Sequence, residues 1–377
     1  MSLTARSILL ALLGAMSLLG LTLLVINVFS LRASSESGSR PDDMLPSQKE
    51  WETPLHNPVL KAGDLLPKAL WNDPTVIKAN GVYVMWMTTS TEKPFQPPIL
   101  PFRAVSSDAK SWRLDPQTPV ATPAGTPFAS IETPSVVRFG GRYHMYFSGI
   151  YPNGKPALMA IGHAVSVDGK SWTVSPAPVL SATGNPQDWN GVLVGEPGAI
   201  VHGDQIFVYF SALAARAGGN PQQDQTIGLA KTSDGEHFQS PTKVLAQSPL
   251  YPAAKGFVGY SAPSAFELNG SVHLLYDVAL YQRNGNPEWQ QVAVHHAVSA
   301  DGETNFIQDD LPLFTRNQFP MARGEIIGPT GLVDDGYIKI WFAGHVPVSQ
   351  LGPLINRGFS GEEFGIYYVQ KALSAFH

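Results

Sequence analysis

The feature that most constrains this chain is a segment that recurs five times at nearly constant spacing. Each copy contains a proline, an apolar run, a tight turn and an aromatic-rich strand of alternating pattern. The prolines are Pro74, Pro134, Pro197, Pro263 and Pro329. They are 60, 63, 66 and 66 residues apart. A repeat built of short strands and turns is typical of stacked or radially arranged supersecondary units.

A second set of turns recurs in step with the prolines. Asp108, Asp168, Asp234 and Asp301 each follow an alternating run and precede an aromatic residue. Asp and Gly supply the backbone geometry of hairpin turns, so we interpret these aspartates as structural. Each unit therefore contains four antiparallel strands. Five units of about 63 residues predict an all-β fold, a five-bladed β-propeller over residues 51–377.

The two ends of this region predict how the ring closes. The segment at Trp51 (WETPLHNPVL) matches the fourth-strand segments at Trp112 and Trp172, yet no first three strands precede it. The last unit reaches a third strand over residues 364–373, and no fourth strand follows. We therefore expect segment 51–60 to complete the last blade, which removes a free sheet edge.

Composition excludes several other classes of protein. The chain has no cysteine, 35 glycines, 32 prolines and a net charge of −5. Without cysteine it has no disulfide scaffold, thiolate metal site or cysteine nucleophile. The mild acidity, with no Lys/Arg run, argues against a nucleic-acid partner. With 44% hydrophobic residues, the chain is too apolar for disorder and too turn-rich for a helical bundle.

Residues 1–32 are predicted to form a transmembrane signal-anchor. The segment 7–31 carries no charge and is flanked by Arg6 and Arg32. It is long enough for the roughly 20 residues of a membrane span and longer than the roughly 7–15 residues of a signal-peptide core. A cleaved signal peptide and a buried helix remain alternatives. The polar residues 33–50 predict a linker, so we expect the propeller outside the cytoplasm, in the periplasm or the extracellular space.

Acidic residues occupy the inner-strand starts of the first three repeats. They are Asp73, Glu132 and Glu196, whereas the last two repeats have Ser261-Ala262 and Ile327-Gly328 there. Because inner strands converge on the propeller axis, we expect the three carboxylates to share one pocket. Glycoside hydrolysis needs one carboxylic acid to protonate the leaving oxygen and one carboxylate to activate water or attack the sugar. A third acidic group raises the acid's pKa by like-charge repulsion.

These motifs resemble the five-bladed propeller glycosidases of glycoside hydrolase families 43, 32, 68, 62 and 130. The resemblance rests on Asn72-Asp73-Pro74, on Glu196-Pro197 two blades later, and on the five repeats with Asp-Gly turns. It covers roughly residues 51–375. The resemblance implies that Asp73 is the base or nucleophile and that Glu196 is the general acid.

The second repeat departs from the pattern of this group. Families 43 and 32 place an Asp directly before the proline, where this chain has Thr133, and Glu132 lies one residue earlier. A shift of one residue reverses the side-chain direction along a strand, so without a bulge Glu132 would point away from the pocket. The Glu-x-Pro order is closer to the Glu-Asp-Pro-Arg motif of family 130, with Thr133 and Ser135 in place of its Asp and Arg.

Four further residues are candidate substrate contacts. Trp71 and Trp189 precede the acidic starts and could stack on a sugar face, with inter-blade packing as the alternative. Arg323 could pair with a substrate carboxylate or a catalytic acid. His345 could contact substrate or an axial ion, with a polar loop role as the alternative. No cofactor or metal motif is expected, although a structural axial ion stays open, and the chain has no nucleophilic serine motif, P-loop or dinucleotide fingerprint.

The sequence thus predicts an exported, membrane-anchored glycoside hydrolase that cleaves a poly- or oligosaccharide with paired carboxylates. The expected partners are a carbohydrate and, through the N-terminal helix, the membrane. One alternative is a non-catalytic carbohydrate-binding propeller that serves polysaccharide assembly or export. A second is a glycoside phosphorylase or transglycosylase, which would need a cationic cluster at the pocket, where Arg323 and Lys255 are the candidates.

Overall fold

The computed structural model describes residues 45–90, 97–215, 223–246, 248–282, 288–319, 322, 324–346 and 363–376. The predicted signal-anchor, residues 1–32, lies outside this described part. Within it, no helix is both long and apolar enough to span a bilayer.

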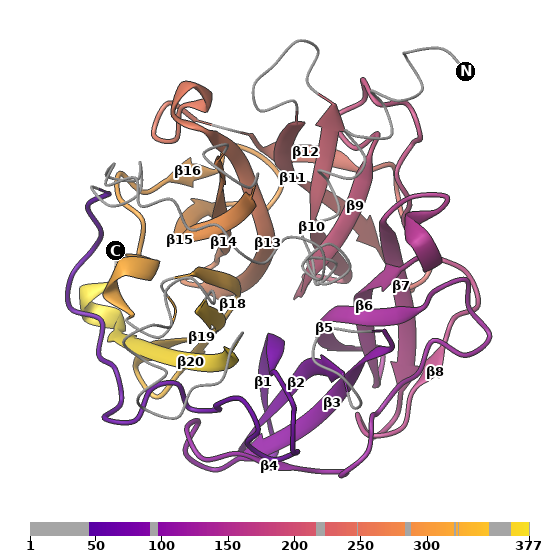
Figure 1. Ribbon diagram of the computed structural model, residues 1–377, viewed down its shortest axis with the longest axis horizontal. Coiled ribbons are helices and arrows are strands. Elements are labelled where there is room, and N and C mark those ends of the chain that lie inside the picture. Colours follow the sequence, from indigo (N-terminus) through magenta and orange to yellow (C-terminus); the bar gives the residue numbers. More distant parts are fainter. Residues whose placement is uncertain are drawn as a thin grey trace, which may run out of the picture.

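The described residues form twenty strands, which group by antiparallel pairing into five successive sheets (Figure 1). The first blade comprises β1 (Asn72–Ala79), β2 (Val82–Ser90), β3 (Ile99–Ser106) and β4 (Arg113–Leu114). The second comprises β5 (Ser130–Phe139), β6 (Arg142–Ile150), β7 (Met159–Ser166) and β8 (Thr173–Val174). The third comprises β9 (Leu193–His202), β10 (Gln205–Ala215), β11 (Gln223–Thr232) and β12 (Thr242–Leu245).

The last two blades continue the same order. The fourth comprises β13 (Phe257–Leu268), β14 (Ser271–Gln282), β15 (Glu288–Ser299), β16 (Ile307–Gln308) and β17 (Phe314–Thr315). The fifth comprises β18 (Glu325–Asp334), β19 (Tyr337–Val346) and β20 (Glu363–Ala372). Short 3-10 helices connect or end the strands: η1 (Pro152–Gly154), η2 (Ala253–Lys255), η3 (Arg316–Gln318) and η6 (Leu373–Ala375).

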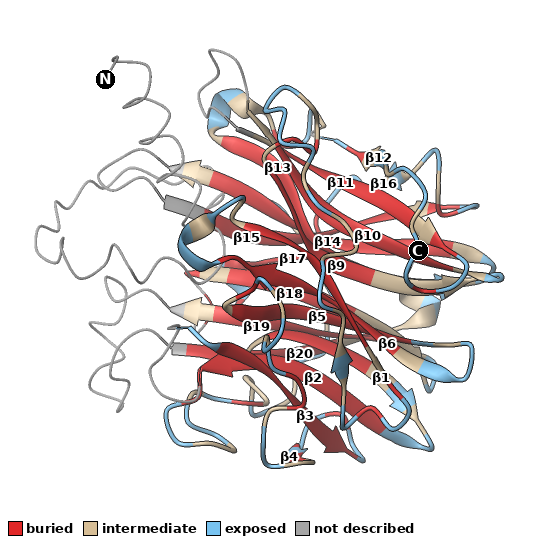
Figure 2. Cartoon of the chain, turned by 90° about the vertical axis from the view of Figure 1, so that its right-hand side faces the viewer, coloured by how far each residue is buried: buried red, intermediate tan, exposed pale blue. Residues whose placement is uncertain are grey.

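The inner strands β1, β5, β9, β13 and β18 contact one another in a closed ring around the axis (Figure 1). A single parallel bridge, Gln225 to Gly259, joins the third and fourth blades at their edge. Buried residues run along the middle of the strands and exposed residues gather at the turns (Figure 2). The predicted five-bladed arrangement is therefore confirmed for the described part of the chain.

The segment before the first blade closes the ring as predicted, but as isolated bridges rather than as a continuous strand. It pairs with β20 at two points, Glu52 to Gln370 and Leu60 to Ile366. Between them, the Asn57 side chain donates to the carbonyl of Tyr368 (2.9 Å) and accepts from its N–H (3.0 Å). The segment contains Pro54 and Pro58, which have no N–H, so a continuous ladder cannot form.

Of the predicted linker 33–50, only the C-terminal end lies in the described part. Residues 45–50 are described, and they lie against the fourth blade. The N–H of Gln48 donates to the carbonyl of Pro312 (2.9 Å), and its side chain donates to Asp309 (2.7 Å). Leu45 packs against the hydrophobic core of the third and fourth blades.

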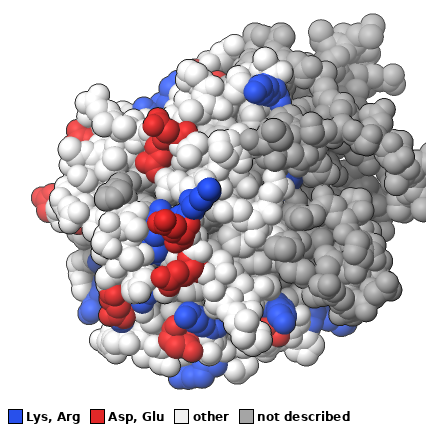
Figure 3. Space-filling model, turned by 90° about the vertical axis from the view of Figure 1, so that its left-hand side faces the viewer, with Lys and Arg blue, Asp and Glu red and all other residues white. Residues whose placement is uncertain are grey.

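Charged side chains of both signs are mixed on one side of the molecule (Figure 3). On that side, Lys and Arg lie among Asp and Glu and do not gather into a stripe of one sign.

A buried ion cluster fastens the seam between the first and fifth blades. Lys78 and Lys339 each donate to the Asp334 carboxylate, at 2.7 and 2.8 Å, and Tyr83 donates a further hydrogen bond to it. Burial opposes ionisation of Asp334, but the hydrogen bonds from Lys339, Lys78 and Tyr83 outweigh it, so its pKa lies well below the usual range.

We expect Asp334→Ala to lower the free energy of unfolding by about 3 kcal/mol, because it leaves the buried ammonium of Lys339 without its main partner. Urea unfolding would measure the loss. The neighbouring Asp335→Asn is the matched control: its side chain is 70% exposed, so its change should stay within about 0.5 kcal/mol. Equal losses in both variants would contradict a special role for the seam.

Candidate active site

Every inner strand is interrupted at its proline by a β-bulge. The register shifts there in all five blades. The residue before each proline has left-handed backbone angles: φ is 51° at Asp73, 47° at Thr133, 50° at Glu196, 46° at Ala262 and 60° at Gly328. A left-handed conformation is costly for residues other than glycine, and such strain gathers at functional sites. Here the five bulges place the equivalent residue of each blade at the same level around the propeller axis.

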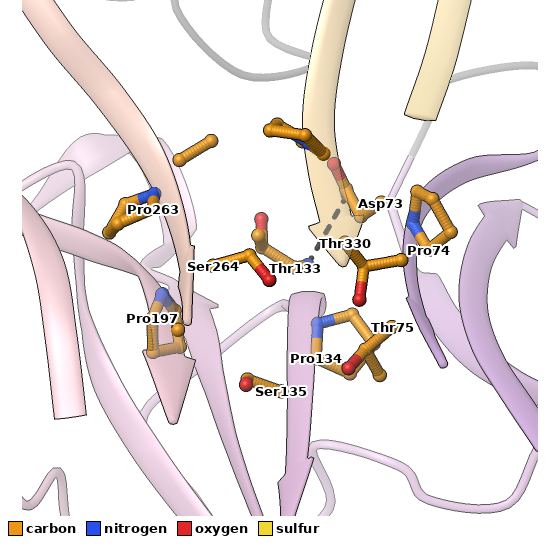
Figure 4. A pocket seen from close by; sticks show the side chains of 14 residues that line it. Asp73, Pro74, Thr75, Thr133, Pro134, Ser135, Pro197, Pro263, Ser264 and Thr330 are labelled. Atoms are coloured by element: carbon orange, nitrogen blue, oxygen red, sulfur yellow. Dashed lines mark hydrogen bonds between the residues drawn. The ribbon is translucent and has the colours of Figure 1, made fainter. Parts of the chain in front are cut away.

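A small cavity of about 20 Å³ lies on the axis, lined by the residues on both sides of these prolines (Figure 4). It is large enough for a water molecule. Asp73 and Thr133 border it and are joined by a hydrogen bond, from the N–H of Thr133 to Oδ2 of Asp73 (3.3 Å). The first and second blades are therefore tied together at this cavity by the Asp73 carboxylate.

Asp73 is buried, with 2% of its surface exposed. Its Oδ2 also accepts a hydrogen bond from the Thr88 hydroxyl (2.9 Å), while its Oδ1 is buried without a hydrogen-bond partner among the described residues. Burial raises the pKa of Asp73 to about 6, although the two hydrogen bonds lower it. One oxygen is thus fixed by the protein and the other is left for a ligand or water.

Glu196 is held in the same way from the third blade. Its Oε2 accepts hydrogen bonds from the Ser211 hydroxyl and from the N–H of Ala262 (3.1 Å), and its Oε1 is buried without a partner in the described structure. Its own N–H donates to the Ser148 hydroxyl (2.7 Å). Burial raises the pKa of Glu196 to about 7; the hydrogen bonds lower it, and the charge of Asp73 raises it further.

Glu132 does lie within reach of the other two acids. It pairs in register with Ser148, whose hydroxyl accepts the N–H of Glu196, so Glu132 faces the third blade. Burial raises its pKa well above the usual range, and the charges of Asp73 and Glu196 raise it further. The bulge between Glu132 and Ser135 makes the simple alternation argument inapplicable here. Glu132 thus lies near the other two acids from the position that directly precedes the left-handed residue Thr133.

A fourth carboxyl group, Asp277 on β14, was not predicted. It is fully buried, and its Oδ2 accepts the N–H of Gly328 (3.0 Å). Burial raises its pKa well above the usual range, and the charges of Glu196, Glu325 and Asp73 add to this. The signal that could have identified it is an aspartate inside an otherwise apolar second strand, LLYDVAL.

The environment of Trp71 favours its packing alternative over sugar stacking. Its ring is fully buried, packs edge-to-face on Phe102 at 5.7 Å, and donates through Nε1 to the carbonyl of Asp64 (2.7 Å). Trp189 is half-buried and stacks on Phe210 at 5.9 Å, which favours its packing alternative. Both tryptophans therefore stabilise their blades.

The remaining candidates are His345, Arg323 and an axial ion. His345 stacks face-to-face on Phe364 at 4.4 Å, with Nδ1 4.0 Å from the Glu325 carboxylate. Burial lowers its pKa to about 4, so it is neutral at pH 7. Arg323 lies outside the described residues. In the part of the chain that is described, no cluster of three or more His, Asp or Glu could hold a metal ion, and an axial ion stays a prediction.

We expect stability to fall with rising pH because of these acids. Burial raises the pKa of Glu196 from 4.5 to about 7, so the folded state favours the protonated form. Its contribution is complete below about pH 4.5 and is lost as the pH rises through about 7. Glu196→Gln cannot ionise, so its stability relative to the wild type should increase by up to about 3 kcal/mol over that range. Urea unfolding from pH 4.5 to 8 measures this, and parallel pH curves would contradict it.

By sequence, no family model and no curated protein matches the chain. By structure, it is similar to a thermostable family-43 glycoside hydrolase, with a TM-score of 0.59 and 12% identity, covering 80% of this chain and 89% of that one. It is also similar to the β-1,2-mannobiose phosphorylase of Listeria innocua in complex with β-1,2-mannobiose, with a TM-score of 0.61 and 11% identity, covering 86% and 98%.

A third similar structure belongs to family 130, a family of mannoside phosphorylases that contains hydrolases targeting β-1,2-mannosidic linkages in Candida mannan. The TM-score is 0.56 and the identity 15%, over 86% of this chain and 96% of that one. At sequence identities this low, the structural similarity establishes the fold and leaves the activity open. The chain therefore has the five-bladed propeller fold of the glycosidases of families 43 and 130, as its repeats predicted.

Proposed function

We propose that the protein is a glycoside hydrolase that cleaves a poly- or oligosaccharide. The observation that supports this is a pair of buried carboxyl groups, each with one oxygen held by hydrogen bonds and the other without a partner among the described residues. Burial raises the pKa of Asp73 to about 6 and that of Glu196 to about 7. Between these values, Asp73 is mostly ionised and Glu196 is mostly protonated. A base and an acid poised in this way near neutral pH are what glycosidic hydrolysis requires.

In this mechanism each acid uses its unpartnered oxygen. Glu196 donates the proton on Oε1 to the glycosidic oxygen as the bond to the anomeric carbon breaks. Asp73 takes a proton through Oδ1 from a water molecule whose oxygen forms the new bond to that carbon. Glu132, whose pKa burial raises well above the usual range, stays protonated in this mechanism. We favour this inverting route over a covalent one because the Asn72-Asp73-Pro74 start resembles that of family 43.

One screen tests the proposal against its alternatives. The full chain is incubated with a panel of aryl glycosides and plant and microbial polysaccharides, with and without inorganic phosphate. Release of a sugar without phosphate supports hydrolysis, and proton NMR of the first anomer gives the stereochemistry. Release only with phosphate would instead identify a phosphorylase, an activity suggested by the similarity to the mannobiose phosphorylase.

The control is Glu196→Gln, which removes the acid and leaves the fold. If wild type and variant release equal traces while both bind an oligosaccharide, the hydrolase proposal fails. In that event the protein is a non-catalytic carbohydrate-binding propeller, and its acids bond sugar hydroxyls.

We further propose that the propeller is exported and anchored in the membrane through residues 1–32. The support is the uncharged segment 7–31 between Arg6 and Arg32. Protease accessibility of the propeller in intact spheroplasts tests the orientation. If the propeller resists the protease in intact spheroplasts and is digested only after the spheroplasts are lysed, export is contradicted.

A further inference from the structure

The second strand of every blade places one residue at the same level of the ring. This residue pairs in register with the one that precedes the bulge residue. The five equivalent residues are Thr88, Ser148, Ser211, Asp277 and Ala343. Three carry a hydroxyl and one carries only a methyl group. Asp277 is the exception, because it places a carboxyl group where its equivalents carry no charge.

The hydroxyls at this level have a structural role that explains why a polar residue is needed. Ser148 accepts the N–H of Glu196 in the next blade (2.7 Å), and Ser211 accepts the N–H of Ala262 (2.8 Å). Asp277 does the same through Oδ2 for the N–H of Gly328 (3.0 Å). A serine would suffice for this bond, so the ring does not account for the second oxygen of Asp277.

That second oxygen lacks a partner. The Asp277 side chain is fully buried, yet its Oδ1 makes no hydrogen bond to any described residue. Its register partner Ser261 is also fully buried, with an equally unpartnered hydroxyl. Two buried polar atoms without partners on the same side of one blade destabilise the fold unless a ligand or water hydrogen-bonds to them.

The position of Asp277 links it to both candidate catalytic acids. On one side, Ser261 directly precedes Ala262, whose N–H binds the Glu196 carboxylate. On the other side, Gly328 lies against Asp73, so that a Cβ on Gly328 would be 3.9 Å from Oδ1 of Asp73. Around the ring, Asp277 therefore stands between the acid and the base, on the side opposite to Glu132.

The surroundings of Asp277 favour a neutral side chain. The ionisable groups that act on it from the described strands are Glu196 on β9, Glu325 on β18 and Asp73 on β1; all three are acidic, and each raises its pKa when ionised. A buried carboxylate without a cation is costly, so such a group keeps its proton. Because Oδ2 accepts the N–H of Gly328, the proton resides on Oδ1.

We propose that Asp277 binds the substrate as a neutral carboxylic acid, whose Oδ1 hydroxyl donates a hydrogen bond to a sugar oxygen held between Asp73 and Glu196. The proposal rests on the proposed function for the nature of the ligand. The unpartnered oxygens of Asp73 and Glu196 face the ligand as an acceptor and as the donor of the transferred proton. Asp277 adds a donor that takes no part in proton transfer, and it thereby fixes the orientation of the sugar.

Two substitutions separate this role from the alternatives. Asp277→Asn stays neutral, can accept the N–H of Gly328 and can donate through its amide, so kcat/KM should stay within about threefold of wild type. Asp277→Ser keeps the ring bond, as Ser148 and Ser211 do, but cannot reach the sugar. It should fold with an unchanged Tm and lose about tenfold or more in kcat/KM, mainly through KM.

Each other pattern overturns the proposal. A serine variant equal to wild type would show that Asp277 serves only the ring. An asparagine variant as poor as the serine variant would show that an ionised carboxylate is required. A serine variant that fails to fold is judged from the asparagine variant and from the measurement below.

A second measurement does not depend on any substrate. Infrared difference spectroscopy of the wild type against Asp277→Asn at pH 7 reports whether Asp277 is protonated. We expect the variant to lose one carboxylic-acid carbonyl band and no carboxylate band. Loss of a carboxylate band instead would overturn the neutral state of Asp277, even if hydrolysis were established. If the variant loses the carboxylic-acid band but the screen finds no cleaved sugar, Asp277 is neutral as proposed, and the proposal that the protein is a hydrolase is refuted.

Discussion

Glu196→Gln is expected to lower turnover of an unactivated oligosaccharide by at least about 10²-fold, the lower range for one general acid. The amide can still accept the N–H of Ala262 and the hydroxyl of Ser211, so the anchoring of the side chain is retained. Only the transferable proton is lost. Steady-state kinetics of purified variant and wild type, on a substrate found in the screen, measure the loss.

The leaving group distinguishes loss of acid catalysis from loss of shape. An aryl glycoside with an acidic phenol needs little protonation, so Glu196→Gln should be far less impaired on it than on a natural oligosaccharide. A loss of the same size on both substrates would contradict the assignment of Glu196 as the acid. The alkaline limb of the pH–rate profile, set by the group with a pKa of about 7, should disappear in the variant.

Asp73→Asn is expected to lower turnover by at least about 10²-fold on both kinds of substrate, because the attacking water needs a base whatever the leaving group. The acidic limb of the profile, set by the group with a pKa of about 6, should be lost with it. The same kinetic series measures both effects. Wild-type turnover by this variant would refute the role of Asp73.

The matched control for Asp73→Asn is Asp108→Asn in the same blade. Asp108 accepts the N–H groups of Lys110 and Ser111 in a turn, and the strand before it pairs Ser106 with Tyr83, at the opposite end from Asp73. This control should lower stability modestly and leave turnover unchanged. Matching losses of turnover in both variants would indicate a general disturbance of the blade.

The fold could be predicted because its repeated signals are local. A proline and an Asp-Gly turn each impose a backbone geometry on their own few residues, so five copies reveal five blades before any contact is known. Asp73 and Glu196 could be located for the same reason, since they directly precede two of these prolines. Because equivalent positions of the repeat lie around the propeller axis, their place in the repeat predicted that both residues lie near it.

The other site residues depend on information that the repeat does not hold. Burial of Trp71 depends on the segment around Asp64, which folds over it and lies outside the repeat. Glu132 depends on the bulge, whose left-handed residue breaks the simple alternation of side chains. Asp277 lies in a second strand and faces the fifth blade, so only the assembled ring shows what it contacts.

The hydrogen bonds that orient the acids cross from blade to blade. Asp73 of the first blade is held by the N–H of Thr133 in the second, and Glu196 of the third is held by the N–H of Ala262 in the fourth. A fragment of one or two blades therefore cannot contain a competent site, even if it folds. If the chain were split between blades, activity should return only when the pieces reassemble into a complete circle. The orientation of these acids is thus a property of the assembled circle and cannot be transferred with a single repeat.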